Sequence, residues 1–190
     1  MREILDAIAR YADAYALLEH LQRGSDLLPS RGDQKTGVIA EFYARCYAGS
    51  LFAGRHIRFG HTSQHAWDLE IGPEPASPGA APLRIQVKSV SAFARYGRIS
   101  TVHPGWDELW LLRLDERLRP EGFLRYRRGD HPWSASGQRA LTMPKRGIAG
   151  SGSRILHCGE DALDALLQIL SDPPSPEAMP GGWCRDVGDS

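Results

Sequence analysis

Residues 83–90 read LRIQVKSV, and this stretch decides the fold. Its apolar residues Leu83, Ile85 and Val87 alternate with polar ones, which predicts a strand with one buried face and one polar face. Residues 108–115 read ELWLLRLD, a nearly continuous apolar run of strand length. Such a run predicts a central strand covered on both faces, so we expect a sheet in the middle of the chain.

The segments around these two strands show helical spacing, strand alternation or turn composition. Helices are expected at 1–23, at 35–47 with Gly49 after the end, and at 159–170. Further strands are expected at 57–59, 66–71, 122–128 and 154–156, and the Pro/Gly/Ala stretch 73–82 predicts a loop. This order of elements predicts an α/β (α+β) fold, with a mixed central sheet flanked by helices.

The composition is typical of a soluble globular protein: 190 residues, 42% of them apolar, with a mean hydropathy of −0.37. This size predicts a single domain over 1–170, followed by a flexible Pro/Gly-rich tail over 171–190. No run approaches the roughly 20 uncharged apolar residues of a membrane span, and the N-terminal pattern contains acids, unlike a signal peptide. We therefore expect a cytoplasmic protein with no membrane partner.

The charges balance, with 23 Lys and Arg residues against 23 Asp and Glu residues. Net charge thus gives no argument for a nucleic-acid partner, which local clustering would have to supply. The basic residues include only three lysines, Lys35, Lys88 and Lys145, so each lysine is informative. The chain has three cysteines without CxxC spacing, which argues against a disulfide framework.

Acidic, amide and ammonium groups fall on two predicted neighbouring strands. Strand alternation places Asp68 and Glu70 on one face of the first strand, and Gln86 and Lys88 on one face of the second. An oxygen-rich site of this kind suits Mg²⁺, which prefers hard ligands and keeps several waters. A lysine beside such an ion holds the water that attacks phosphorus, or stabilises charge on the phosphate. Glu41, on the second helix, would supply a further carboxylate.

The order Glu41, Asp68, Gln86-x-Lys88 and then the strand-bearing segment GWDELWLLRLD (105–115) resembles the PD-(D/E)XK nuclease superfamily, which includes type II restriction endonucleases. The resemblance covers 34–115 and implies a restriction-endonuclease-like αβββαβ core. It also implies a divalent-metal-dependent endonuclease that hydrolyses DNA phosphodiester bonds with Mg²⁺, for which Mn²⁺ can substitute.

The resemblance assigns roles to particular residues. Lys88 would be the catalytic lysine, and Asp68 and the backbone carbonyl of Val87 would bind the metal with help from Glu41. The full implied catalytic set is Lys88, Asp68, Gln86 and Glu41, and the implied metal set is Asp68, Glu41, Gln86, Val87 and Glu70. Two positions depart from the family pattern. Trp67 precedes Asp68 in place of proline, and the neutral amide of Gln86 replaces an acid, which should lower the affinity for a divalent ion.

Other interpretations of these residues remain open. In one interpretation, the solvated face of an antiparallel sheet carries Asp68, Gln86 and Lys88. Glu70 is either a second metal ligand or a surface partner of Arg84. The whole chain would alternatively be a catalytically inactive nuclease-fold module for DNA binding or interaction, or a repair or junction-resolving enzyme with the same chemistry.

The segment 91–98, SAFARYGR, follows the strand with Lys88 and mixes arginine with aromatic residues, a composition suited to phosphate contact. Scattered solvent-facing arginines are the competing interpretation. Arginines at 125, 127 and 128 would extend this surface, and 129–152 is where substrate recognition is expected. Cutting both strands of a duplex favours a homodimer, with the first helix as a candidate interface. The candidate DNA-binding residues are Ser89, Arg95, Arg98, Lys145 and Arg146.

Overall fold

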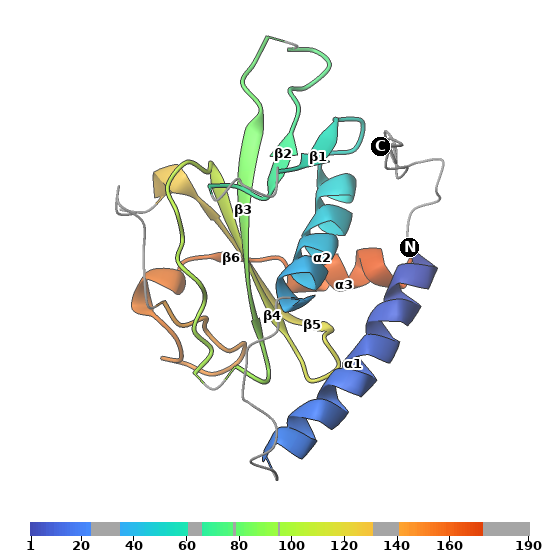
Figure 1. Ribbon diagram of the computed structural model, residues 1–190. Helices are drawn as coiled ribbons and strands as arrows, with labels where there is room; N and C mark the ends of the chain where they lie inside the picture. The colour runs from blue at the N-terminus through green and yellow to red at the C-terminus, as the bar shows by residue number, and fades with distance from the viewer. Residues whose placement is uncertain (24–34, 61–65, 78, 95, 131–140, 173–190) are drawn as a thin grey trace.

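The computed structural model describes residues 1–23, 35–60, 66–77, 79–94, 96–130 and 141–172. These residues form three helices, two short 3-10 turns and six strands (Figure 1). The helices are α1 (Arg2–Arg23), α2 (Lys35–Leu51) and α3 (Leu163–Ser171). The strands are β1 (Ile57–Phe59), β2 (Leu69–Ile71), β3 (Leu83–Ser91), β4 (Glu108–Leu114), β5 (Pro120–Arg127) and β6 (Glu160–Asp161).

The six strands make one mixed sheet in the order β1-β2-β3-β4-β5-β6. Neighbouring strands are antiparallel except β3 and β4, which run parallel with Ile85 beside Glu108 and Ser91 beside Leu114. The expected fold class, a mixed sheet flanked by helices, is confirmed. A parallel pair needs a crossover, and here residues 92–107 provide it without a helix among their described residues. The second helix of an αβββαβ order is therefore not found in that stretch.

Two apolar clusters cover the two faces of the sheet. The helices pack on one face, where Tyr43 of α2 joins Trp110 and Phe123, and Figure 1 shows all three helices on one side of the molecule. Irregular segments cover the other face, where Trp106 and Met143 join Leu109 and Leu111, the β4 residues that point away from the helices. Every residue of β4 is buried, as its continuous apolar run predicts.

Several predicted boundaries are wrong, each for a tertiary reason. Helix α2 continues through Gly49 to Leu51, because Gly49 is buried in the packed part of the helix, which offsets its low helix propensity. Residues 154–156 form a 3-10 turn, not a strand. The last strand is instead β6, which pairs with β5 and delays the start of α3 from 159 to Leu163. Within the described residues no helix has the length and apolarity to cross a membrane. Of the predicted tail, residues from 173 onward lie outside the description.

Candidate functional site

The candidate site lies where β2 stops and β3 continues. Strand β2 was expected over 66–71 but pairs with β3 only along Leu69–Ile71, with Leu69 beside Ile85. Strand β3 runs on to Ser91. From Val87 onward, β3 therefore has no described strand on its β2 side, and groups from other elements can approach its backbone there.

Asp68 occupies the junction. Its backbone N–H donates to the Ile85 carbonyl at 2.8 Å, and its Oδ2 accepts the Val87 N–H at 2.6 Å. The carboxylate thus takes the place of the next rung of the β2–β3 ladder. The N–H and C=O of one strand residue point to the same side, so the Val87 carbonyl is directed to the side on which Asp68 lies. Two of the oxygens that the resemblance assigns to a metal are brought together in this way.

Glu41 reaches the same place from α2. Its pKa is raised to about 7, mainly by burial and also by the negative charge of Asp68, while the Lys88 ammonium partly offsets the rise. Burial also raises the pKa of Asp68, against the lowering effects of the Val87 N–H and Lys88. The three charges therefore lie close enough to act on one another, although they come from three elements. Burial therefore opposes ionisation of both carboxyl groups, and a cation bound beside them would favour their charged forms.

The donor set fits a hard divalent cation that keeps part of its water shell. Glu41, Asp68 and the Val87 carbonyl offer oxygen ligands, and Mg²⁺ is typically held by one or two carboxylates plus waters. Within the described residues no group of three or more His, Cys, Asp or Glu side chains could hold a metal ion. The arrangement thus differs from a closed four-ligand protein cage of the zinc type.

Gln86 lies in the core, which makes the solvated-face interpretation wrong for this residue: it is 0% exposed. Its Nε2 donates to the Ala66 carbonyl at 3.0 Å, and its Oε1 accepts the His103 N–H at 3.1 Å. The amide therefore connects β3 to the segment before β2 and to the β3–β4 crossover. For a metal it would offer the neutral Oε1, which already accepts the His103 N–H.

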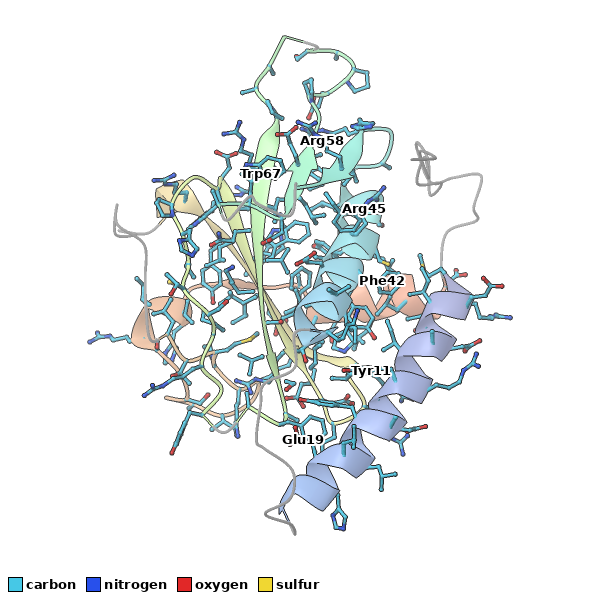
Figure 2. The ribbon with its side chains drawn as sticks, viewed as in Figure 1. Tyr11, Glu19, Phe42, Arg45, Arg58 and Trp67 are labelled. Atoms are coloured by element: carbon cyan, nitrogen blue, oxygen red, sulfur yellow. The ribbon has the colours of Figure 1, made fainter. Side chains whose placement is uncertain are left out.

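Glu70 is turned toward arginines. Arg58 Nη2 lies 2.6 Å from Glu70 Oε1, and Arg84 Nε lies 3.8 Å from Oε2. Figure 2 shows Arg58 and Trp67 at the β1–β2 side of the molecule, away from Phe42 on α2. Both oxygens of Glu70 thus face cations, an arrangement that fits the ion-pair interpretation with Arg84 and adds Arg58 to it.

The predicted DNA-binding residues differ in how exposed they are and in whether they already have charged partners. Ser89 is half-buried on β3, just beyond the site, while Arg98 is exposed and lies with its guanidinium 5.7 Å from the Tyr96 ring centroid. Lys145 is exposed, but Arg146 is held by Asp161 at 3.1 Å and Asp164 at 2.7 Å. Arg95 lies outside the described residues.

Two arginines have a role that alternation did not reveal. Arg125 does not extend a basic surface, because it is buried: its guanidinium lies over the Tyr47 and Trp110 rings and pairs with Glu108 at 3.0 Å. Arg113, also buried, points from β4 to the face opposite α2, where it donates to the Met143 carbonyl at 2.6 Å. The signal for Arg113 was present in the sequence, since it is the one cation inside the apolar run ELWLLRLD.

No protein-family model matches the chain, and no curated protein matches it. Among solved structures, that of a bacterial homing endonuclease, I-Ssp6803I, is similar over 74% of this chain and 96% of that chain, with 17% sequence identity and a TM-score of 0.43. A likeness of this degree carries no argument about activity, so the function has to be argued from the site itself.

Proposed function

We propose that this protein is a Mg²⁺-dependent endonuclease that hydrolyses DNA phosphodiester bonds in the manner of a restriction endonuclease. The observation that carries the proposal is the convergence of Glu41, Asp68 and Lys88 beside the open edge of β3. Two carboxyl groups whose pKa values are raised mainly by burial, beside a lysine, form an arrangement suited to a cation and a phosphate together.

Each group in the site has a defined task in this proposal. Glu41, Asp68 and the Val87 carbonyl would hold Mg²⁺, which when bound supplies charge stabilisation at the phosphate and makes water more acidic. The Lys88 ammonium donates hydrogen bonds to the attacking water or to a non-bridging phosphate oxygen. Water releases one proton to solvent as its oxygen forms the new P–O bond, the bond to the leaving sugar oxygen breaks, and that oxygen takes up a proton from solvent. The Val87 N–H holds the Asp68 carboxylate in place throughout.

A second candidate function is a nuclease-fold module that binds DNA without cleaving it. The placement of Gln86 favours it, because the amide brings no charge and already makes two hydrogen bonds to backbone groups. A weak metal site would leave binding intact and remove catalysis.

Incubation with supercoiled plasmid and with linear and branched DNAs tests the proposal. Mg²⁺ and Mn²⁺ are added separately, EDTA is the metal-free control, and Lys88→Ala is compared with Lys35→Ala, a lysine variant at the start of α2. We expect metal-dependent nicking or fragments that Lys88→Ala abolishes and Lys35→Ala retains. Absence of cleavage with a gel shift that persists in Lys88→Ala would instead support the binding module. Preferential cutting of branched DNA would indicate a junction-resolving enzyme.

We also propose that cleavage of a duplex uses a homodimer, because one such site cuts one strand at a time. Helix α1 exposes Leu17 and Leu18, which are 60% and 51% accessible, and is the candidate interface. Sedimentation with and without duplex DNA tests this, and a monomer under both conditions would contradict it.

A further inference from the structure

A cleft of about 950 Å³ opens at the end of β3, beyond the candidate active site. One wall is the start of the β3–β4 crossover, which includes Tyr96, and the opposite wall is formed by residues 142–152. Glu19 of helix α1, which is labelled in Figure 2, also lines the cleft. The cleft is thus built from five separate parts of the chain, since Arg113 of β4 and Glu121 of β5 also line it.

A buried guanidinium lies in this cleft. The Arg113 side chain is 7% exposed, and it lines the cavity together with Glu121. Nη2 donates to the Met143 carbonyl, whereas Nε has no hydrogen-bond partner among the described residues. The nearest described carboxylate oxygen, Glu121 Oε1, is 4.0 Å from Nε on a side chain that is 44% exposed. A guanidinium carries five donors, so this buried charge is incompletely compensated.

The lining of the cleft carries both cations and acids. The chain passes close to the guanidinium at Gly97, where φ is +59° and a Cβ would lie 3.3 Å from Nη2. At the rim Arg146 is neutralised by Asp161 and Asp164, so Lys145 is the rim cation that remains for a ligand. Tyr96 also lines the cleft; it is 62% exposed, and the Arg98 guanidinium lies 5.7 Å from its ring centroid. The cleft also contains two acids: Glu121, whose Oε1 lies 4.0 Å from Arg113 Nε, and Glu19 of α1.

The cleft is in line with the candidate active site. Arg113 is the register partner of Val90, two residues beyond Lys88 on β3, and in parallel strands such partners share a face. Two residues along a strand and one strand across correspond to roughly 8 Å between the Lys88 and Arg113 Cα atoms. This is about two base steps of a nucleic-acid strand, so one strand can reach both.

We propose that this cleft binds a phosphate group of the same nucleic-acid strand that occupies the active site, with Arg113 at the floor, Lys145 at the rim and Tyr96 as a stacking surface for a base. The inference rests on the proposed function, because the strand is the substrate assigned there. Phosphate esters also occur in free nucleotides, so the test includes both sources.

The three lysines allow a direct test by protection from acetylation, read residue by residue in a mass spectrometer. The protein is acetylated in a buffer that contains Ca²⁺, in the presence and in the absence of a 16-base-pair DNA duplex. Separate samples contain thymidine monophosphate or inorganic phosphate in place of the duplex, at the same phosphate concentration. We expect the duplex to reduce acetylation of Lys88 and Lys145 at least fivefold and to leave Lys35 unchanged. Equal protection of Lys145 by the mononucleotide would overturn the strand assignment.

The outcomes separate the inference from the proposed function. Protection of Lys88 without Lys145 would overturn the phosphate-binding role of the cleft and leave the proposed active site unaffected. Protection of Lys145 without Lys88 would support the cleft and overturn the proposed catalytic role. Protection of neither would overturn both.

Binding measurements on an exposed residue avoid any effect on folding. Fluorescence anisotropy should show that Lys145→Met weakens duplex binding about 5- to 10-fold and lowers the slope of log K against log salt by about one, with Lys35→Met as the matched control. Arg113→Lys should weaken binding in the same direction while it retains the thermal transition. Binding within twofold of the parent protein in Lys145→Met would contradict the proposal.

Discussion

The Asp68 carboxylate accepts the backbone N–H of Val87 at 2.6 Å, and this bond anchors the acid that precedes β2 to the middle of β3. It stands in for a ladder hydrogen bond, so the geometry depends on an acceptor at this position, while the proposed chemistry depends on a negative charge. The two requirements can therefore be separated by substitution.

Asp68→Asn should abolish cleavage and preserve the fold. The asparagine Oδ1 can still accept the Val87 N–H, but the charge that would hold a cation is lost, so we expect a decrease in activity of at least about 100-fold. The melting temperature of the metal-free protein should stay the same or rise, because a carboxylate with a burial-raised pKa is removed. Plasmid nicking and thermal denaturation measure the two effects. Retained nicking would exclude Asp68 from the site.

The stability of the metal-free protein should fall as pH rises from 4.5 to 7. In this interval the folded chain keeps a proton on Glu41, whose pKa is about 7, whereas the unfolded chain with a pKa of 4.5 has released it. Glu41→Gln should reduce this slope, while Asp68, whose pKa is also raised, changes stability with pH in the same direction. Because Glu41 is partly exposed, we expect the free energy of unfolding of Glu41→Gln at pH 8 to exceed that of the parent protein by only about 1 kcal/mol. This corresponds to a melting temperature about 2–4 °C higher.

Urea denaturation in EDTA at several pH values checks the Glu41 prediction. An identical slope in Glu41→Gln would show that the carboxyl does not titrate in the shifted range.

Gln86→Leu should destabilise the protein whether or not a metal ion is present. The change removes the hydrogen bonds that the amide makes with the Ala66 carbonyl and the His103 N–H, at a cost of about 2–5 kcal/mol. Gln86→Glu separates structure from chemistry, because it keeps an acceptor for His103, loses the donor to Ala66 and adds charge at the site. We expect it to lower metal-free stability and to strengthen Mg²⁺-dependent stabilisation. Unchanged stability in Gln86→Leu would refute the connecting role.

Glu70→Gln should leave cleavage within about threefold of the parent protein. Its oxygens face Arg58 and Arg84, and partly exposed ion pairs of this kind contribute about 1 kcal/mol or less. The same plasmid assay as for Asp68→Asn makes the comparison direct. A loss of activity as large as that of Asp68→Asn would instead identify Glu70 as a metal ligand.

Glu108→Ala should be among the most damaging substitutions away from the site. Glu108 Oε2 accepts hydrogen bonds from Trp110 Nε1 at 2.7 Å and from Arg125 at 3.0 Å, and both members of the ion pair are buried. Removing one partner leaves a buried charge, which costs about 3–5 kcal/mol. The double variant Glu108→Leu with Arg125→Met should recover part of that loss in a urea titration. A double variant less stable than Glu108→Ala would contradict this account.

The secondary structure could be predicted where a local pattern is sufficient. Alternation in β3 and the continuous apolar run of β4 follow from which faces are buried, and both strands lie within a residue or two of their predicted ends. The short pairing of β2 and the late start of α3 could not be predicted, because each is set by hydrogen bonds to a remote strand, β3 in one case and β5 in the other.

The sequence by itself determined the order of Glu41, Asp68 and Lys88 and the period-2 pattern that separates Gln86 and Lys88 from Ile85 and Val87, since these depend only on neighbours along the chain. The tertiary structure decided what each charged or polar group does. Folding pairs Gln86 with the backbone of Ala66 and His103 through hydrogen bonds. It places Glu70 beside two arginines and buries Arg113 and Arg125. The reason is physical: a buried polar group is defined by the partners that folding brings to it, and these hydrogen-bond partners lie at least 12 residues away in the sequence.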